Sequence, residues 1–385
     1  MNTTAVMPPS LSDKPVFTPI IAPNGADPGV KDDFTPSKHL SFKKMPKTYS
    51  MEELGFQSDQ GISPIAVSEP FPLFTKACVQ RMRQEALAPE VFKNCQYSSN
   101  LAHCYLRGFA SKYAPFVYDA WKNPETLAIV SRIAGIDLVP ALDIDIAHIN
   151  LSVKSEEEKR EELDAVKERA NHEADEGIAG CPWEDDKPIV GWHTDSYPFV
   201  CVTMLSDCTE MVGGETALRT GTGDIIKVRG PQMGCAVILQ GRYIEHQALR
   251  TLGGTERITM VTAFRPRDPF ARDDTVLTTV RGISNITELY NQFSEYRFEI
   301  LEERLRLQLK EIREMMATGR GVSTKKLKSF ITEQERFLAH TKEEMVNDED
   351  VVYGMLVQDV AQDKVDESRV INPKSPRVRK RQRRT

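Results

Sequence analysis

The stretch Gly191-Trp-His193-Thr-Asp195-Ser196, followed further along the chain by Glu245-His246-Gln247, decides the fold that this sequence predicts. A His-x-Asp pair with a later lone histidine is the pattern of a metal site with two imidazoles and one carboxylate. On a β-strand, positions i and i+2 point to the same side, so His193 and Asp195 can converge on one ion. These ligands fill one face of an octahedron and leave adjacent positions open, as non-haem iron(II) chemistry requires.

Short β-branched and apolar runs surround these ligands. They cover residues 199–205, 225–228, 235–239 and 258–264, with glycine turns at Gly213-Gly214 and Gly223. Such runs predict strands of a closed antiparallel barrel made of two sheets. The predicted class is α+β, with a double-stranded β-helix (jelly-roll or cupin-like) barrel. We place its core at 140–267 and a charged helical insertion at 154–180, where Glu, Lys, Arg and Asp predominate.

This order of features resembles the iron(II)- and 2-oxoglutarate-dependent dioxygenases. The resemblance implies that His193, Asp195 and His246 are the metal ligands and the catalytic centre, and that Fe(II), 2-oxoglutarate and O2 are the cofactor and co-substrates. In that family an Arg-x-Ser or Arg-x-Thr unit beyond the second histidine binds the distal carboxylate of 2-oxoglutarate. Arg257-Ile-Thr259 fits this unit, because a guanidinium can bind a carboxylate through two parallel hydrogen bonds.

The reaction implied by the resemblance is oxidation of an unactivated C–H bond with release of succinate and CO2. Hydroxylation, desaturation and oxidative ring closure all remain open. The chain looks most like fungal small-molecule oxygenases, including those of secondary metabolism, so an amino acid or a natural-product intermediate is the expected substrate. Two alternatives are a protein- or nucleic-acid-modifying oxygenase of the same family and a non-redox cupin-type metalloenzyme.

Candidate pocket residues come from three places in the sequence. The stretch 142–153 alternates like a strand with two partly polar faces, so His148 and Asn150 can line a cavity. A loop before the metal ligands carries Trp183, which can close on a substrate. Proximity in sequence to the ligands adds three aromatic residues: Tyr197, Phe199 and Tyr243.

Composition is that of a globular protein with a net charge of −6 in 385 residues. No apolar run approaches the length of a membrane span, and the N-terminus has no signal-peptide pattern, so we expect no membrane contact and a cytoplasmic location. The seven cysteines form no Cys-x-x-Cys pair, which favours reduced thiols.

The ends of the chain carry other patterns. Residues 1–48 are rich in proline and predict a disordered or extended arm, followed by a dioxygenase domain at 49–283 with packing helices near 71–92, 111–121 and 124–133. Residues 284–345 predict an antiparallel helical hairpin that braces the barrel or makes a homodimer. Residues 346–385 form a tail with a basic end, for which a nuclear address is an alternative; we expect no nucleic-acid partner.

Overall fold

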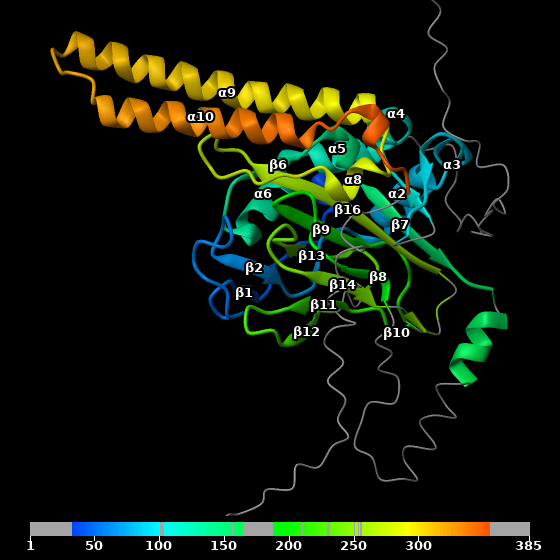
Figure 1. Ribbon diagram of the computed structural model, residues 1–385. Helices are drawn as coiled ribbons and strands as arrows, with labels where there is room; N and C mark the ends of the chain where they lie inside the picture. The colour runs from blue at the N-terminus through cyan, green and yellow to red at the C-terminus, as the bar shows by residue number, and fades with distance from the viewer. Residues whose placement is uncertain are drawn as a thin grey trace, which may run out of the picture.

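The computed structural model describes residues 33–100, 104–155, 157–164, 188–209, 211–228, 232–249, 251–252, 254 and 256–354. Within these ranges, helices cover one side of a large antiparallel sheet, a smaller antiparallel sheet lies on its other side, and a long helical hairpin extends away from both (Figure 1). The predicted α+β class with antiparallel sheets is therefore confirmed.

The larger sheet has ten strands in the order β1-β2-β13-β9-β16-β7-β5-β4, with β3 beside β13 and β6 beside β16. Its strands are β1 (Thr48–Ser50), β2 (Ile65–Ser68), β3 (Phe71–Pro72), β4 (Gln96–Tyr97), β5 (Tyr105–Leu106), β6 (Leu138–Pro140), β7 (His148–Val153), β9 (Phe199–Met204), β13 (Cys235–Leu239) and β16 (Glu256–Pro266). The smaller sheet has the order β12-β11-β14-β8, made of β8 (Pro188–His193), β11 (Thr216–Arg219), β12 (Ile225–Val228) and β14 (His246–Leu249). A separate pair joins β10 (Val212–Gly213) to β15 (Thr251–Leu252).

The central strands of the larger sheet are buried on both faces. On β9, Val202 lines a cavity between the two sheets, whereas Cys201 packs into the core beneath the helices. On β16, Thr259 lines the cavity, whereas Ile258 and Met260 belong to that core. Because side chains alternate along a strand, each central strand contributes to a cavity and to a core at once. This explains why these runs are nearly continuous in apolar residues.

Short helices cover the other face of the sheet: α1 (Pro36–His39), α2 (Lys76–Ala86), α3 (Pro89–Cys95), α4 (Ala110–Tyr113), α5 (Pro115–Lys122) and α6 (Pro124–Ala134). A further short helix, α8 (Thr278–Arg281), lies on the cavity side, where Thr279 and Val280 line the cavity. The helix predicted over 71–92 is strand β3 followed by two helices that separate before Pro89, and the one predicted over 111–121 separates before Pro115. Proline lacks an N–H and disfavours the helical conformation in the preceding residue, so each helix ends there. The helix predicted at 124–133 is confirmed as α6.

The stretch 142–153 differs from the single strand that its alternation predicts. Asp143–Asp145 form a 3-10 turn, and β7 begins only at His148. Between them Ala147 has φ +64°, and its N–H donates to Thr262 Oγ1 at 3.0 Å. This left-handed residue reverses the local direction of the chain, so that Asp145 and His148 both line the cavity.

Parts of the predicted arm and insertion fall within the described residues. In the predicted arm, Phe34, Leu40 and Phe42 pack on the core beneath the helices, where the Phe34 ring lies edge-on to Phe116 at 5.8 Å. Thr48 already belongs to β1. Residues 157–164 of the charged insertion are helical. Residues 1–32, 165–187 and 355–385 lie outside the described residues, so most of the arm, Trp183 and the basic tail remain predictions.

The hairpin consists of α9 (Ile286–Ala317) and α10 (Thr324–Glu344). Asn285 and Ser323 cap the two helices by accepting hydrogen bonds from the N–H groups of residues 288 and 326, which places both starts close to the predicted ones. None of the described helices is long and apolar enough to cross a membrane.

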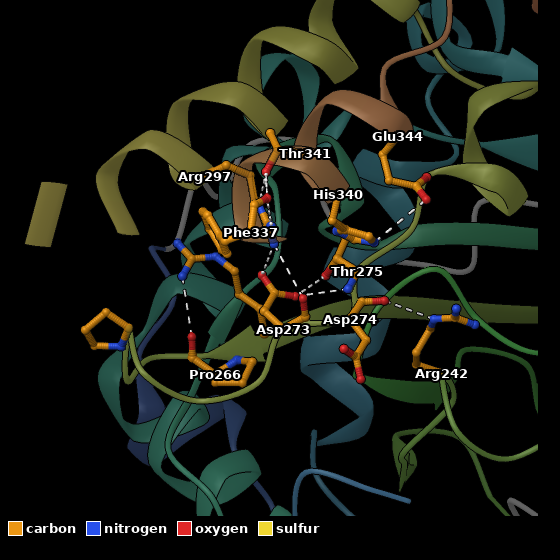
Figure 2. A network of polar contacts seen from close by, with 12 residues as sticks. Arg242, Pro266, Asp273, Asp274, Thr275, Arg297, Phe337, His340, Thr341 and Glu344 are labelled. Atoms are coloured by element: carbon orange, nitrogen blue, oxygen red, sulfur yellow. Dashed lines mark hydrogen bonds and ion pairs between the residues drawn. The ribbon is translucent and has the colours of Figure 1, made fainter. Parts of the chain in front are cut away.

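Polar contacts hold the hairpin to the sheets (Figure 2). Arg297 of α9, whose side chain is 1% exposed, forms an ion pair with Asp273 at 3.3 Å and donates to Thr341 Oγ1 of α10 at 2.8 Å. Its guanidinium also stacks on Phe337 at 3.5 Å. Glu344 of α10 accepts a hydrogen bond from the N–H of Leu277 at 2.7 Å. The base of the hairpin is therefore fastened to the segment 273–281 that follows β16.

Candidate active site

Two neighbouring strands of the smaller sheet bring the two histidines together. His193 ends β8, His246 begins β14, and the two residues are paired across the strands, with ring centroids 4.4 Å apart. Asp195 follows β8, with Oδ1 3.7 Å from His193 Nε2 and Oδ2 3.4 Å from His246 Nε2. One ligand atom from each of the three residues lies within 4.8 Å of the others. Residues separated by most of the barrel sequence thus form one compact donor set.

Hydrogen bonds orient both imidazoles toward the centre of this set. His193 Nδ1 lies 2.7 Å from the carbonyl oxygen of Gly191, and His246 Nδ1 lies 2.9 Å from that of Ile244. A carbonyl only accepts, so each Nδ1 carries the proton and each Nε2 keeps a lone pair, the tautomer that a metal ion requires. Burial and the neighbouring His246 lower the pKa of His193 to about 4. His193 is therefore neutral at pH 7.

The backbone of Asp195 is fixed by a hydrogen bond, but one oxygen of its carboxylate has no hydrogen-bond partner among the described residues. Its backbone N–H donates to the carbonyl of Gly241 at 2.8 Å, and a Cβ at Gly241 would lie 1.8 Å from Asp195 Oδ2. That oxygen is buried and has no hydrogen-bond donor among the described residues. A buried carboxylate oxygen without a hydrogen-bond donor is unfavourable unless it binds a cation. The donor set, two imidazoles and this carboxylate, therefore fits a divalent iron ion.

The triad opens into a cavity of about 190 Å³ between the two sheets. Strands β7, β9, β13 and β16 of the larger sheet and β8, β11 and β14 of the smaller one line it with alternate residues. Aliphatic side chains, mainly from β9, β13 and β16, form one part of the wall. Polar side chains, including those of the triad, form the rest.

Arg257 enters the same cavity from β16. The residue is 8% exposed, and Nε has no hydrogen-bond partner among the described residues; no described carboxylate forms an ion pair with it either. Burial lowers the pKa of Arg257, against the opposing influence of Cys208 and Glu215. A buried cation without an ion-pair partner is costly and creates a binding place for an anion. Thr259, two residues along the same face of β16, is 2% exposed and also lines the cavity.

A second polar cluster lies in the cavity wall around Arg107, which follows β5. Arg107 Nη1 lies 2.5 Å from Asp145 Oδ1, and the Tyr197 hydroxyl donates to the other oxygen of Asp145. Arg107 Nη1 also lies 3.4 Å from His148 Nδ1, and His148 Nε2 lies 3.1 Å from Asn150 Oδ1. Burial and Arg107 lower the pKa of His148 to about 3, so it accepts from the arginine as a neutral ring. Burial and Asp145 raise the pKa of Tyr197 well above its usual value.

The structure separates the candidate pocket residues into three groups. His148, Asn150 and Tyr197 line the cavity. Phe199 does not, because it points to the opposite face of β9 and is fully buried in the core beneath the helices. Tyr243 lies outside the cavity too, since its hydroxyl donates to Asp274 Oδ2 at 3.0 Å. Trp183 lies outside the described residues. Proximity in sequence to a ligand was therefore a poor guide to the cavity.

Sequence reasoning missed Arg107 and Asp145. Neither belongs to a recognised motif. The one available signal was a lone arginine before Gly108 within the apolar run that begins at Tyr105. Gly108 has φ +71°, a conformation that glycine adopts at little cost.

The residues on either side of Asp195 are held by the segment 273–281. Arg242 donates to the carbonyl of Asp274 at 3.0 Å (Figure 2) and to Thr194 Oγ1 at 3.3 Å. The Ser196 hydroxyl lies 2.6 Å from Thr279 Oγ1. The hairpin fastens this same segment, so the residues around Asp195 are supported from outside the two sheets.

No family model and no curated protein matches the chain. Among solved structures, a prolyl-4-hydroxylase of Pseudomonas putida is 14% identical with a TM-score of 0.33, over 52% of this chain and 93% of that one. The non-haem α-ketoglutarate-dependent epimerase SnoN from nogalamycin biosynthesis is 13% identical with a TM-score of 0.36, over 56% and 82%. AviO1 of Streptomyces viridochromogenes is 13% identical with a TM-score of 0.35, over 54% and 91%. At these TM-scores, an assignment of function rests on the cavity of this chain itself.

Proposed function

We propose that this chain is an Fe(II)- and 2-oxoglutarate-dependent oxygenase that oxidises a C–H bond of a small molecule. The observation that carries the proposal is the buried Arg257, without an ion-pair partner among the described residues, in the same cavity as the triad His193, Asp195 and His246. A metal site alone fits many enzymes. A metal site that shares its cavity with an unpaired guanidinium fits a co-substrate that binds the metal at one end and carries a carboxylate at the other.

We propose in addition that the two sheets are the two sides of a double-stranded β-helix. Alternate residues from both sheets line one cavity, and the ligands lie on adjacent strands at its side. This is the arrangement expected for a barrel whose interior holds a binding site.

Each residue then has a physical task. The two imidazoles and Asp195 would hold iron at the side of the cavity. Arg257 binds the distal carboxylate of 2-oxoglutarate through parallel hydrogen bonds, and the Thr259 hydroxyl adds a donor. The aliphatic walls exclude water and hold the substrate close. Bound iron supplies O2 activation: one oxygen atom enters succinate, formed with CO2 from 2-oxoglutarate, and in hydroxylation the other enters the C–H bond.

Anaerobic titration tests the proposal. Chelation of Fe(II) by 2-oxoglutarate produces a visible charge-transfer band, which should appear with the wild-type protein and be absent with His246→Ala. Admission of O2 should then give succinate. If iron binds and no band or succinate forms, the alternative of a non-redox cupin-type metalloenzyme replaces this proposal.

The alternative of a macromolecular substrate depends on the basic tail. Removing residues 374–385 should leave turnover of a small substrate unchanged, because a charged chain end contributes little to a buried cavity. A large fall in kcat on a small substrate would favour the alternative. A cytoplasmic location and a place in fungal secondary metabolism are proposed on the sequence alone.

We also propose that the hairpin joins two copies of the chain. Several large apolar side chains of the hairpin are exposed: Phe298, Leu305, Leu309, Met316, Ile331 and Leu338. Exposed apolar side chains grouped in this way mark protein contacts. Light scattering should give the mass of a dimer for the wild type, and Leu305→Glu with Leu309→Glu should give a monomer; a wild-type monomer at all concentrations would contradict this.

A further inference from the structure

The ion pair between Arg107 and Asp145 has no role in binding the metal or the co-substrate. It lies in the cavity wall, and the two side chains are 1% and 3% exposed. The contacts that fix it are internal: Arg107 Nε donates to Ser284 Oγ at 2.8 Å, and Tyr197 donates to Asp145. Nη2 of Arg107 is buried and has no hydrogen-bond partner among the described residues. The two charges therefore neutralise each other inside the wall.

The charged side chains in the cavity wall can be assigned one by one, to find which of them could pair with a charge on the substrate. Apart from imidazoles, the described residues that line the cavity include four charged side chains: Arg107, Asp145, Asp195 and Arg257. In the proposed function, Asp195 binds the metal and Arg257 binds the distal carboxylate of 2-oxoglutarate. Arg107 and Asp145 form an ion pair with each other. No charged side chain of the described wall is left to pair with a charge on the substrate.

Aliphatic side chains in the wall can pack against the apolar surface of a substrate. Aliphatic residues from four strands face one another across the space: Val200, Val202, Leu218, Val237, Leu239 and Val261. Burial of apolar surface against them is favourable, whereas a charged group would lose its water without gaining a counter-charge. The desolvation penalty for such a group exceeds what neutral hydroxyl and amide groups in the wall can return.

We propose that the substrate of this cavity is an uncharged, largely apolar molecule, and that the closed Arg107–Asp145 pair determines this selectivity. The inference rests on the proposed oxygenase function, which assigns Asp195 and Arg257 to other ligands. It argues against a free amino acid, whose ammonium and carboxylate groups would each need a partner. It favours an uncharged intermediate of a biosynthetic sequence.

Four probes that share a six-membered carbon ring test the proposal: cyclohexanone, cyclohexanol, cyclohexanecarboxylate and cyclohexylammonium. The full-length protein is loaded with Mn(II) and 2-oxoglutarate, and the relaxation of probe protons by the paramagnetic ion is measured by NMR. Cyclohexanone and cyclohexanol should bind at least about tenfold more tightly than either charged probe. Equal or tighter binding of a charged probe by the wild-type protein would overturn the proposal.

Two variants test whether the ion pair sets the selectivity. Asp145→Asn keeps the shape of the side chain and leaves the Arg107 charge unpaired, so cyclohexanecarboxylate should bind about tenfold more tightly than to the wild type. The matched control is Asp143→Asn, because Asp143 lies in the same turn but pairs with Lys122 outside the cavity. Unchanged preference in Asp145→Asn, or the same gain in both variants, would overturn the role of the pair.

The same samples separate this inference from the proposed function. If Mn(II) or 2-oxoglutarate fails to bind the wild-type protein, the proposed function is wrong. The inference about the substrate then loses its basis, because it assigns Asp195 to the metal and Arg257 to 2-oxoglutarate. If both bind and the charged probes are preferred, only the inference about the substrate fails. Should Asp145→Asn not fold, the preference of the wild-type protein still decides the substrate class, and Asp145→Ser, compared with Asp143→Ser, tests the role of the pair by the same measurement.

Discussion

Replacing Arg257 by alanine removes the group that we propose binds the distal carboxylate of 2-oxoglutarate. Truncating one partner of a buried, hydrogen-bonded charge pair costs about 2 to 5 kcal/mol of binding. With about 1.4 kcal/mol for each factor of ten, the apparent KM for 2-oxoglutarate should rise by roughly 30-fold to several thousand-fold. Because Thr259 remains to donate one hydrogen bond, we expect a value toward the lower end. Fe(II) should still bind, since no ligand of the triad has changed.

Stability distinguishes this role from a structural one. A structural arginine loses ion pairs when it is replaced, and the protein becomes less stable. Arg257 has no described ion-pair partner, and its burial lowers its pKa, so the charge itself is unfavourable without an anion. Arg257→Met, which keeps the apolar stem, should therefore leave the free energy of unfolding of the metal-free protein unchanged or raise it.

The assay is succinate formation at increasing 2-oxoglutarate concentration. Arg257→Lys should recover only part of the affinity, because an ammonium cannot reproduce the planar fork. Arg267→Ala is the matched control just beyond the same strand; its exposed ion pair with Asp137 has no part in the cavity, so its curve should equal that of the wild type. An unchanged curve for Arg257→Ala would refute the reasoning. Arg250, the other arginine that follows His246 closely in the sequence, would then be the next residue to test. Substrate oxidation without any 2-oxoglutarate would refute the co-substrate itself.

Three further predictions concern the metal and the hairpin. His246→Ala should lose most iron while circular dichroism stays native, and His172→Ala, in the charged insertion, should keep both iron and activity; iron at wild-type stoichiometry in His246→Ala would exclude that ligand. Gly241→Ala should lower iron affinity steeply without unfolding the protein, because its Cβ would lie 1.8 Å from Asp195 Oδ2; calorimetric titration with iron measures this. Arg297→Ala leaves the buried carboxylate of Asp273 unpaired and should lower the free energy of unfolding, measured in urea, by about 3 to 5 kcal/mol. A loss below about 1 kcal/mol would contradict the proposed fastening of the hairpin.

Local patterns predicted much of this fold. The strand at 235–239 and the helix at 124–133 were found within a residue, because alternation, capping residues and proline act over a few positions. The errors were local as well. Two predicted helices were too long because Pro89 and Pro115 were given too little weight. The turn before β7 was missed because the left-handed Ala147 donates its N–H to Thr262 Oγ1, a distant contact that no local pattern reveals.

For the cavity, sequence and tertiary structure contributed different information. The sequence by itself determined which residue types were available for the metal and the co-substrate, since the spacing of His193 and Asp195 and the Arg257 unit are local features with a chemical meaning. Only the tertiary structure decided which other side chains meet them. Arg107 and Asp145 come from separate segments, and their pairing depends on the register of β5 and β7 and on the turn at Ala147. A charge that is paired inside a wall and one that is left open to a ligand look the same in a sequence, because the difference lies only in their neighbours in space.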